Sequence, residues 1–285
     1  MSVMPSVPPP AAPAAHTPLT VAQAAAWAQT LGLPRLDVQV LLLHALSRAL
    51  HDRAWLLAHG DDLLDTTAQT TFAAHAQRRL NTEPVAYITG QKEFFGLTLH
   101  VDHRVLDPRA DTETLVEWAL SCLADTPSPD VVDLGTGSGA IALALKHARP
   151  DAQVSAVDAS ADALSVASAN AERLALPVDF HHGSWLAPLN GRTFDAIVSN
   201  PPYVASDDVH LAALKHEPLS ALASGADGLD DIRMIVREAT QYLKPNGWLL
   251  IEHGYDQAHA VQTLLGNQGF VNVQSRPDLA GILRC

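Results

Sequence analysis

The feature that most constrains this chain is a regular alternation of short apolar segments with helical segments, which begins near residue 130. The expected strands are 131–134, 154–158, 178–182, 194–199 and 248–252. The expected helices are 140–147, 160–174 and 231–243. Such alternation is typical of an α/β fold in which helices cover both faces of a parallel sheet. Ligands of these sheets bind beyond the carboxyl ends of the strands, so functional residues are expected directly after strands.

The part of the chain before this region has a helical pattern, from Thr20 to about Asn81. Thr20 and Gln23 form a capping box, in which each side chain satisfies a free backbone N–H. The segment 65–80 is expected to be a further helix, and 93–106 has the alternation of a β-hairpin. One apolar stripe is expected to face a partner helix, and it consists of Leu36, Val40, Leu43, Leu46 and Leu50.

Composition and charge exclude several classes of protein. The 285 residues carry a net charge of −13, which repels nucleic acid at long range unless a basic patch reverses it. No apolar run reaches the roughly 18 residues of a membrane span, and the first 16 residues lack the pattern of a signal peptide. Cys122 and Cys285 cannot build a disulfide framework or a cysteine zinc site. We expect a cytoplasmic protein that does not bind a membrane.

A glycine-rich turn follows the first expected strand, between Asp133 and Gly139. Glycine permits a sharp turn and lets a ligand approach the backbone without a Cβ in the way. The spacing G-x-G-x-G is one residue shorter than the usual dinucleotide motif. Asp158 lies at the end of the next strand, where a carboxylate suits the two ribose hydroxyls of an adenosine. Ser160 is placed to cap the following helix, so Asp158 is not needed for that role.

The sequence Asn200-Pro201-Pro202-Tyr203 follows the fourth expected strand. It offers a side-chain carbonyl, a backbone carbonyl and an aromatic face on a stiff segment of chain. A planar NH2 group would donate to Asn200 and Pro201 while lying on the Tyr203 ring. The alternative is a Pro-Pro turn with an Asx turn at Asn200, but the neighbouring glycine loop favours a functional site.

Two further features are less informative. Trp185 follows the third expected strand, where its ring would flank an adenine or pack into the core. The histidines do not predict a metal site, because His100 and His103, like His181 and His182, lack a third ligand at a recognisable spacing. We therefore expect no metal.

The chain resembles the class I S-adenosylmethionine-dependent methyltransferases, and specifically the peptide chain release factor N5-glutamine methyltransferases (the PrmC/HemK family). The resemblance covers nearly all residues after Pro18, and Ala110, Asp107 and Ser184 depart from the usual pattern. It rests on EPVAYITG (83–90), EFFGL (93–97), PRADTE (108–113), DLGTGSG (133–139), NPPY (200–203), EP (217–218), DGL (227–229) and EHGYDQ (252–257).

The resemblance implies a doubly wound, mostly parallel seven-stranded sheet and S-adenosylmethionine as methyl donor, with S-adenosylhomocysteine as product. It implies that Asn200 and Tyr203 are catalytic and that Asn200, Pro201, Pro202 and Tyr203 bind the glutamine of a release factor. The residues that it implies for donor binding are Gly135, Thr136, Gly137, Ser138, Gly139, Asp158, Trp185 and Asn200.

Four segments are expected on this basis: a disordered proline-rich tail (1–17), an N-terminal helical substrate-recognition domain (18–92), a β-hairpin linker (93–108) and the S-adenosylmethionine-dependent methyltransferase domain (109–285). The expected partner is a peptide chain release factor, with no direct nucleic-acid binding, and the expected state is a monomer. Transfer to the side-chain amide of the glutamine in a Gly-Gly-Gln motif is the expected reaction.

Three other functions stay open at this point. A methyltransferase for an exocyclic amino group of a nucleobase would use the same four residues, Asn200 to Tyr203, although the charge of −13 and the lack of a Lys/Arg-rich stretch disfavour it. A nicotinamide-dependent oxidoreductase would use the glycine loop and Asp158, but not Asn200 to Tyr203. A binding module without turnover leaves those four residues unexplained.

Overall fold

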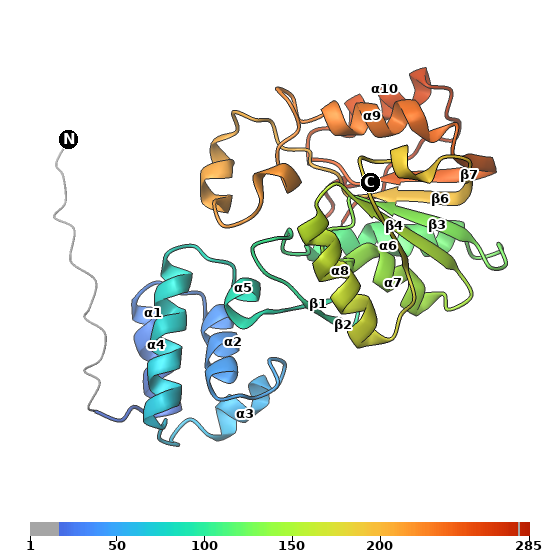
Figure 1. The fold of residues 1–285 in the computed structure, drawn as a ribbon. Coiled ribbons are helices and arrows are strands. Elements are labelled where there is room, and N and C mark those ends of the chain that lie inside the picture. The colour runs from blue at the N-terminus through green and yellow to red at the C-terminus, as the bar shows by residue number, and fades with distance from the viewer. Residues whose placement is uncertain (1–16, 279) are drawn as a thin grey trace, which may run out of the picture. The chain divides into compact units, whose positions relative to one another are not determined.

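The computed structural model describes residues 17–278 and 280–285, so the expected proline-rich tail lies outside the described residues except for Thr17. The chain divides into two compact units, Met1–Gly90 and Gln91–Cys285, and each is described by itself (Figure 1). Within the described residues, no helix combines the length and the apolar character needed to cross a bilayer.

The first unit is built from helices. Its described helices are α1 (Val21–Thr30), α2 (Arg35–Ala45), α3 (Arg53–Ala58), α4 (Thr66–Leu80) and α5 (Val85–Thr89). The predicted capping box is confirmed, because the Gln23 amide donates to the Thr20 hydroxyl at 3.2 Å and the Thr20 amide donates to the Gln23 side chain at 2.9 Å. Asp65 caps α4 by accepting from the Ala68 amide at 2.7 Å, so this helix begins where the sequence predicts.

The predicted apolar stripe is partly wrong. α2 ends at Ala45, and the chain then turns through Ser47, whose φ of 54° is left-handed. Leu46 and Leu50 therefore lie beyond the helix, and Leu36 at its start is 52% exposed. Leu43 of the predicted stripe is buried in the core as expected, and the other buried residues of α2 are Val38, Leu41 and Leu42.

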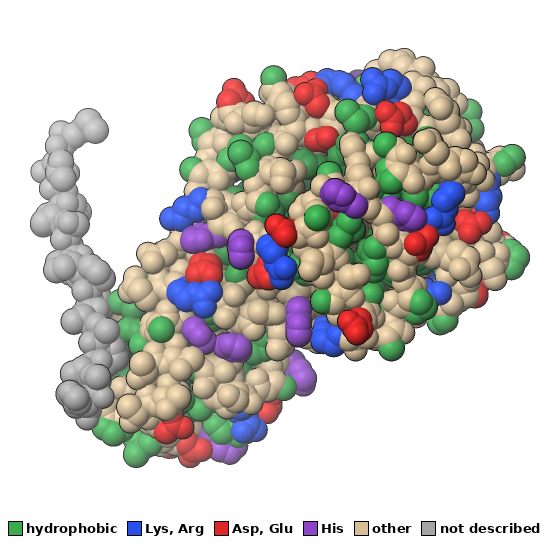
Figure 2. Space-filling model, viewed as in Figure 1, with side chains coloured by type: hydrophobic (Ala, Val, Ile, Leu, Met, Phe, Trp, Pro, Cys, Tyr) green, Lys and Arg blue, Asp and Glu red, His purple; other side chains and the backbone are tan. Residues whose placement is uncertain are grey.

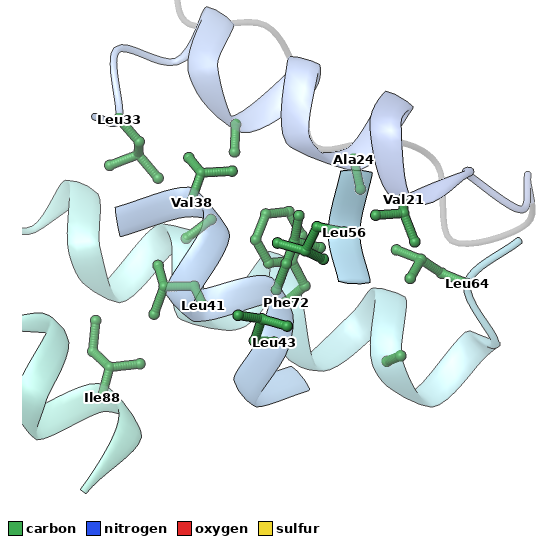
Figure 3. Packing of buried hydrophobic residues seen from close by; sticks show 14 residues of the cluster. Val21, Ala24, Leu33, Val38, Leu41, Leu43, Leu56, Leu64, Phe72 and Ile88 are labelled. Carbon is green, nitrogen blue, oxygen red and sulfur yellow. The ribbon is translucent and has the colours of Figure 1, made fainter. Parts of the chain in front are cut away.

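Phe72 lies at the centre of the core of the first unit. Figure 3 shows its ring on α4 between Ala24 of α1, Leu43 of α2 and Leu56 of α3. The side chain is 1% exposed, and complete burial of such a ring contributes about 1.5–3 kcal/mol to folding. The first unit thus has a hydrophobic core of its own.

A β-hairpin opens the second unit, formed by β1 (Gln91–Phe94) and β2 (Leu97–His100). Phe95 and Gly96 form its two-residue turn, and both have a positive φ, which matches the twist of paired strands. The predicted hairpin is confirmed, but Val105 and Leu106 are not part of it. The short turn sets the register, and pairing ends at His100, opposite Gln91.

The main sheet consists of β3 (Asp130–Leu134), β4 (Gln153–Asp158), β5 (Asp179–His182), β6 (Phe194–Ser199) and β7 (Leu243–Ile251). The strand order is β5-β4-β3-β6-β7, and every neighbouring pair is parallel. The α/β class is confirmed, whereas the expected seven strands are not found in the described residues. After the last helix the described residues form only an isolated antiparallel bridge, between Pro277 and Leu283, and therefore add no strand to the sheet.

Helices cover both faces of this sheet. Figure 1 shows α6, α7 and α8 on one side and α9 and α10 on the other. Their bounds are α6 (Glu113–Cys122), α7 (Ala140–Ala148), α8 (Ala161–Leu174), α9 (Asp230–Ala239) and α10 (Ala258–Asn267). Short 3-10 segments connect them, namely η1 (Ala110–Thr112), η2 (Ala187–Leu189), η3 (Val209–Leu214) and η4 (Leu219–Ala221).

Candidate active site

The strand order places the predicted site residues at one edge of the sheet. β3 lies between β4 and β6, and Leu134 at its end pairs with Val157 on one side and Ser199 on the other. The order of the strands reverses at this point, which is where doubly wound sheets bind ligands. The carboxyl ends of these three strands therefore lie side by side, with the glycine loop after β3, Asp158 as the last residue of β4 and Asn200 directly after β6.

The glycine loop needs its glycines for two different reasons. Gly135, Gly137 and Gly139 have φ values of 73°, 55° and 84°, in the left-handed region that favours glycine. At Gly139, a Cβ would lie 3.0 Å from Leu143 and 3.3 Å from the Cβ of Ala167, so α7 and α8 approach too closely for a side chain. At Gly137 a Cβ would meet nothing within 4 Å, so the backbone is open to a ligand there.

Asp133, the last residue but one of β3, is hydrogen-bonded to the glycine loop and to the start of α7. Its Oδ2 accepts from the Thr136 hydroxyl at 2.6 Å and from the Ala142 amide at 3.2 Å. The side chain is fully buried, and burial raises the pKa of this carboxyl to about 7 despite those hydrogen bonds. Its Oδ1 is buried and has no hydrogen-bond partner among the described residues.

Asp158, at the end of β4, also holds the glycine loop. Its Oδ2 accepts from the Gly137 amide and its Oδ1 accepts from the Ser160 amide, both at 2.8 Å. Ser160 caps α8 through the Ala163 amide, as the sequence predicts. Each oxygen of an ionised carboxylate has two acceptor sites, so one remains on each oxygen of this half-buried side chain.

Trp185 lies against the glycine loop at Gly135. Its ring is 3.3 Å from the position that a Cβ would take at Gly135, and it also packs against the hydrophobic core that includes Leu134 and Ile235. Ser138 is 3% exposed, and its carbonyl oxygen accepts from the Asn170 side chain of α8 at 3.0 Å. The loop is thus fixed on both sides.

Asn200 follows β6 directly and is held by its side-chain amide. Its Nδ2 donates to the Thr112 hydroxyl at 3.1 Å, which sets the plane of the amide group. Among the described residues, no group donates to the Asn200 Oδ1 or to the carbonyl oxygen of Pro201. The rings of Pro201 and Pro202 fix two φ angles of the backbone, so both acceptor oxygens belong to a conformationally rigid segment.

Tyr203 is anchored at both its backbone and its side chain. Its hydroxyl donates to Glu252 Oε1 at 3.2 Å, and its carbonyl oxygen accepts from the Gln257 side chain at 2.9 Å. Burial and the neighbouring Glu252 carboxylate raise the pKa of the phenol above its usual value, so Tyr203 stays neutral at ordinary pH. A Cβ at Gly228 would collide with the Tyr203 carbonyl oxygen, which explains the glycine there.

Comparisons with known proteins decide the family of this chain. The family model described as the methyltransferase small domain matches residues 111–275, and the one described as the PrmC N-terminal domain matches residues 18–90. Release factor glutamine methyltransferase from Coxiella burnetii is 47% identical over 88% of this chain and 90% of its own length. The protein of the same name from Xylella fastidiosa is 49% identical over 88% of this chain and 92% of its own length.

The chain belongs to the release factor glutamine methyltransferase family. The relative from Pseudomonas aeruginosa, also named release factor glutamine methyltransferase, is 47% identical over 87% of this chain and 89% of its own length. These matches extend through both structural units of the chain. The family assignment therefore covers the helical unit as well as the sheet.

Solved structures support the fold of this family member. A methyltransferase from Pyrococcus furiosus aligns with a TM-score of 0.51 at 18% identity, over 74% of this chain and 95% of its own. The hMettl16 catalytic domain in complex with the MAT2A 3'UTR hairpin 6 aligns with a TM-score of 0.56 at 16% identity, over 75% of this chain and 79% of its own. At such identities the likeness concerns the fold alone.

Two polar residues of the site were not assigned a role from the sequence of this family member. Thr112 contacts Asn200, and Glu252 contacts Tyr203. Glu252 directly follows β7, the same kind of position that predicted Asp158 and Asn200, so its place after a strand is a signal that was available. Thr112 lies 88 positions from Asn200 and precedes a helix, and nothing in its local sequence indicates the contact.

Arg109 and Glu113, in the PRADTE segment, are both engaged in structural contacts. Arg109 donates to Glu217 at 2.6 Å, and the other oxygen of Glu217 accepts from the Asp107 amide at 3.1 Å. Glu113 accepts from the Phe95 amide at 3.0 Å, which ties the hairpin turn to α6. Among the described residues, no group of three His, Cys, Asp or Glu side chains is arranged to hold a metal.

Proposed function

We propose that this chain transfers a methyl group from S-adenosylmethionine to the side-chain amide nitrogen of a glutamine in peptide chain release factors. The observation that carries the proposal is the orientation of Asn200, whose Nδ2 is bound to Thr112 so that its Oδ1 stays available beside the Pro201 carbonyl. The names of the relatives support the choice of a release factor as substrate.

The segments after β3 and β4 fit the donor. The open backbone at Gly137 admits a ligand, because a Cβ there would meet nothing within 4 Å. The free acceptor sites of Asp158 suit ribose hydroxyls, and the Trp185 ring offers a flat apolar surface beside Gly135. The residues that we propose to hold the donor are Gly135, Thr136, Gly137, Ser138, Gly139, Asp158, Trp185 and Asn200.

The segment Asn200 to Tyr203 fits a carboxamide. A carboxamide nitrogen carries two N–H bonds in one plane, and Asn200 Oδ1 and the Pro201 carbonyl oxygen are two acceptors on one stiff segment. We propose that Pro202 and the Tyr203 ring complete the binding surface for the flat group. The S-adenosylmethionine donor supplies a methyl group on a positively charged sulfur and leaves as S-adenosylhomocysteine.

Orientation is the main contribution that these residues make to the rate. A carboxamide nitrogen is a poor nucleophile because its lone pair is delocalised into the carbonyl group. Two acceptors that fix its N–H bonds also fix the direction of the nitrogen, and such positioning supplies a share of the roughly 7–11 kcal/mol attributed to proximity.

The same acceptors also stabilise developing charge. As the nitrogen becomes more positive in the transition state, its hydrogens bind more strongly to the oxygens of Asn200 and Pro201 than they do in the ground state. No strong base is needed in this arrangement, because a methylated amide nitrogen readily loses its proton to water. Tyr203 stays neutral and contributes its ring rather than a proton.

We further propose that the helical first unit recognises the release factor and that the protein acts in the cytoplasm as a monomer. The match of residues 18–90 to the family model described as the PrmC N-terminal domain supports a role in recognition. The cysteines of the described residues, Cys122 and Cys285, are both free, which suits a reducing compartment.

The experiment that tests the proposal follows a labelled methyl group. The protein is incubated with labelled S-adenosylmethionine and, in separate reactions, a release factor, the same factor with its Gly-Gly-Gln glutamine replaced by glutamate, RNA and DNA. We expect label on the intact factor alone. Label on nucleic acid and none on the factor would overturn the proposal in favour of a nucleobase amino-methyltransferase.

The charge distribution favours a protein substrate over nucleic acid. On the face that Figure 2 shows, Lys and Arg side chains are scattered among acidic and apolar ones and form no continuous basic stripe. The net charge of the chain is −13. A protein that methylates nucleic acid needs a basic footprint for the phosphate backbone, and this surface offers none on the visible face.

A further inference from the structure

α8 contacts the glycine loop through two residues on one of its faces. Ala167 packs against Gly139, where an added Cβ would lie 3.3 Å from the Ala167 Cβ. Asn170 is three positions further along the helix, and residues at that spacing share a face. Its Nδ2 donates to the Ser138 carbonyl oxygen at 3.0 Å. The helix therefore both packs against the loop and hydrogen bonds to it.

The same side chain also holds the end of the β-hairpin. Asn170 Nδ2 donates to the His100 carbonyl oxygen at 2.9 Å, and its Oδ1 accepts from the His100 amide at 2.7 Å. His100 is the last residue of β2, and α8 packs beside this strand (Figure 1). One carboxamide group thus connects the hairpin to the glycine loop.

The Asn170 carboxamide uses its full hydrogen-bonding capacity. Its two N–H bonds go to the two backbone carbonyl oxygens, and its Oδ1 accepts from the His100 amide and from Arg173 at 3.3 Å. Because carbonyl oxygens face Nδ2, the amide group cannot turn over without losing both bonds. The side chain is completely buried, and a buried amide that is fully satisfied holds its partners in one arrangement.

Asn170 and Asp158 hold consecutive residues of the loop. Asp158 accepts from the Gly137 amide at 2.8 Å, and Asn170 donates to the carbonyl oxygen of the next residue, Ser138. Asp158 also accepts from the Ser160 amide, and Ser160 caps α8, the helix that carries Asn170. An acceptor at the end of β4 and a donor on the following helix therefore fix the loop at two adjacent points.

We propose that Asn170 is a positioning residue for the methyl donor, which fixes the glycine loop to the end of the β-hairpin. This inference rests on the proposed function, because it requires that the loop binds S-adenosylmethionine. Asn170 is completely buried, so it acts through the Ser138 carbonyl group and not by touching the donor. With the Gly137 amide bound to Asp158, this carbonyl group is the second point that sets the direction of the loop backbone.

A loop that is ordered in advance binds its ligand more tightly. Glycine has more conformational freedom to lose than any other residue, and ordering a loop during binding lowers affinity. The three glycines of this loop give it that freedom, and the hydrogen bonds of Asp158 and Asn170 remove it before the donor binds. Loss of the Asn170 bonds should therefore appear as weaker donor binding.

Arg173 provides a matched control on the same helix. It donates to the Thr98 carbonyl oxygen of β2 and to Asn170 Oδ1. Among the described residues, its hydrogen bonds include none to the glycine loop. Replacing Arg173 therefore loosens the contact between α8 and the hairpin while Asn170 stays bound to Ser138.

The test compares four variants of the full chain with the unaltered protein. Asn170→Asp keeps the shape but turns an oxygen, in place of the NH2 group, towards the Ser138 and His100 carbonyl oxygens, and Asn170→Ala removes the group. Arg173→Met removes the contact with the hairpin alone. Val236→Ala removes buried apolar volume on α9, which lies on the other face of the sheet, and so lowers stability away from the loop.

Four quantities are measured for each protein. They are the Kd of S-adenosylhomocysteine by calorimetry, the KM values of the donor and of a release factor, the rate of amide hydrogen exchange over residues 133–143, and the thermal unfolding midpoint. The midpoint reports stability, so the effect of each substitution on donor binding can be compared between variants that are destabilised to the same extent.

We expect both Asn170 variants to raise the donor Kd and the donor KM about tenfold, while the KM of the release factor changes less than about twofold. Amide exchange in the glycine loop should become faster in these two variants. Arg173→Met and Val236→Ala should keep the donor Kd within about twofold of the unaltered protein, even where the unfolding midpoint falls as far as in the Asn170 variants.

Three results would overturn the inference. The first is a donor Kd in both Asn170 variants that equals that of the unaltered protein. The second is a loss of donor affinity in Val236→Ala or Arg173→Met as large as that in the Asn170 variants, because Asn170 would then act only through general stability. The third is a failure of both Asn170 variants to fold while Val236→Ala folds, which would assign Asn170 a structural role alone.

Failure of the proposed function gives a different result. An unaltered protein that binds no S-adenosylhomocysteine, or that methylates no release factor, contradicts the proposed function before any variant is compared. If the unaltered protein does both and the Asn170 variants match it, only the role of Asn170 fails.

Discussion

At the scale of single residues, the candidate site is a set of acceptors held in place by their neighbours. Asn200 Oδ1 and the Pro201 carbonyl oxygen accept no hydrogen bond from the described residues. Thr112 fixes the orientation of the Asn200 amide by accepting from its Nδ2. Asp158 is engaged differently, because it accepts from backbone amides of the glycine loop and of the helix start that follows it. The loop and the carboxylate that we propose for ribose binding are thus one unit.

Asn200 carries the most specific prediction at this scale. Because its Oδ1 binds more strongly in the transition state than in the ground state, Asn200→Ala should lower kcat about a hundredfold, a loss typical of removing one preorganised hydrogen-bonding group. Its effect on donor affinity should be much smaller, within about fivefold on the same reasoning. Steady-state kinetics with a release factor and calorimetry with S-adenosylhomocysteine measure the two effects. Equal losses in both would contradict the assigned role.

The glycine loop provides a matched pair of substitutions. Both Gly137→Ala and Gly139→Ala place a side chain at a positive φ, which costs about 1–2 kcal/mol. Only the second also brings a Cβ to 3.0 Å from Leu143, so it should lower the free energy of unfolding by a further 1–3 kcal/mol, roughly. Urea unfolding of both variants measures the difference. Equal stability would show that α7 and α8 can move apart freely.

The sequence predicted the residues that sit in local motifs and missed those that depend on long-range contacts. Asp158 ends a strand, Asn200 and Tyr203 follow one, and all three stand next to recognisable neighbours, so local pattern was enough to select them. Thr112 reaches Asn200 across 88 positions, and Tyr203 reaches Glu252 across 49. Only the parallel pairing of β6 and β7 and the placement of η1 bring these groups together, and no spacing in the sequence encodes that.

At the scale of elements, apolar pattern located the strands but not all of their ends. β7 was expected over 248–252, whereas it runs over Leu243–Ile251. Its first half is polar, and Lys244 there binds Asp130 of β3 at 2.5 Å and Asp195 of β6 at 2.8 Å. Ion pairing across the sheet therefore stabilises a stretch of strand that hydrophobic pattern cannot reveal.

The bundle of the first unit provides a prediction about packing. Phe72→Ala removes a ring that is 1% exposed and should lower the stability of this unit by about 3–5 kcal/mol. Leu57→Ala is the control, because Leu57 is 73% exposed and its loss should change stability by less than about 0.5 kcal/mol. Hydrogen exchange of the amides in α2 and α4 measures both. Similar exchange in the two variants would contradict the central place of Phe72.

At the scale of the whole molecule, the two units are proposed to divide the work between recognition and chemistry. An intact release factor should have a lower KM than a short peptide that carries the Gly-Gly-Gln motif, because the peptide offers little surface to the first unit. Phe72→Ala should raise the KM of the intact factor and leave that of the peptide unchanged. Equal KM values for factor and peptide would remove the proposed role of the first unit.

The central claim is that two oxygen atoms, from Asn200 and Pro201, hold the amide of the substrate glutamine. The most direct test is a crystal structure of the protein with S-adenosylhomocysteine and free glutamine. We predict that the glutamine side-chain nitrogen donates to Asn200 Oδ1 and to the Pro201 carbonyl oxygen and points towards the sulfur. A glutamine bound elsewhere, or an Asn200 that turns its NH2 group to the ligand, would contradict the claim.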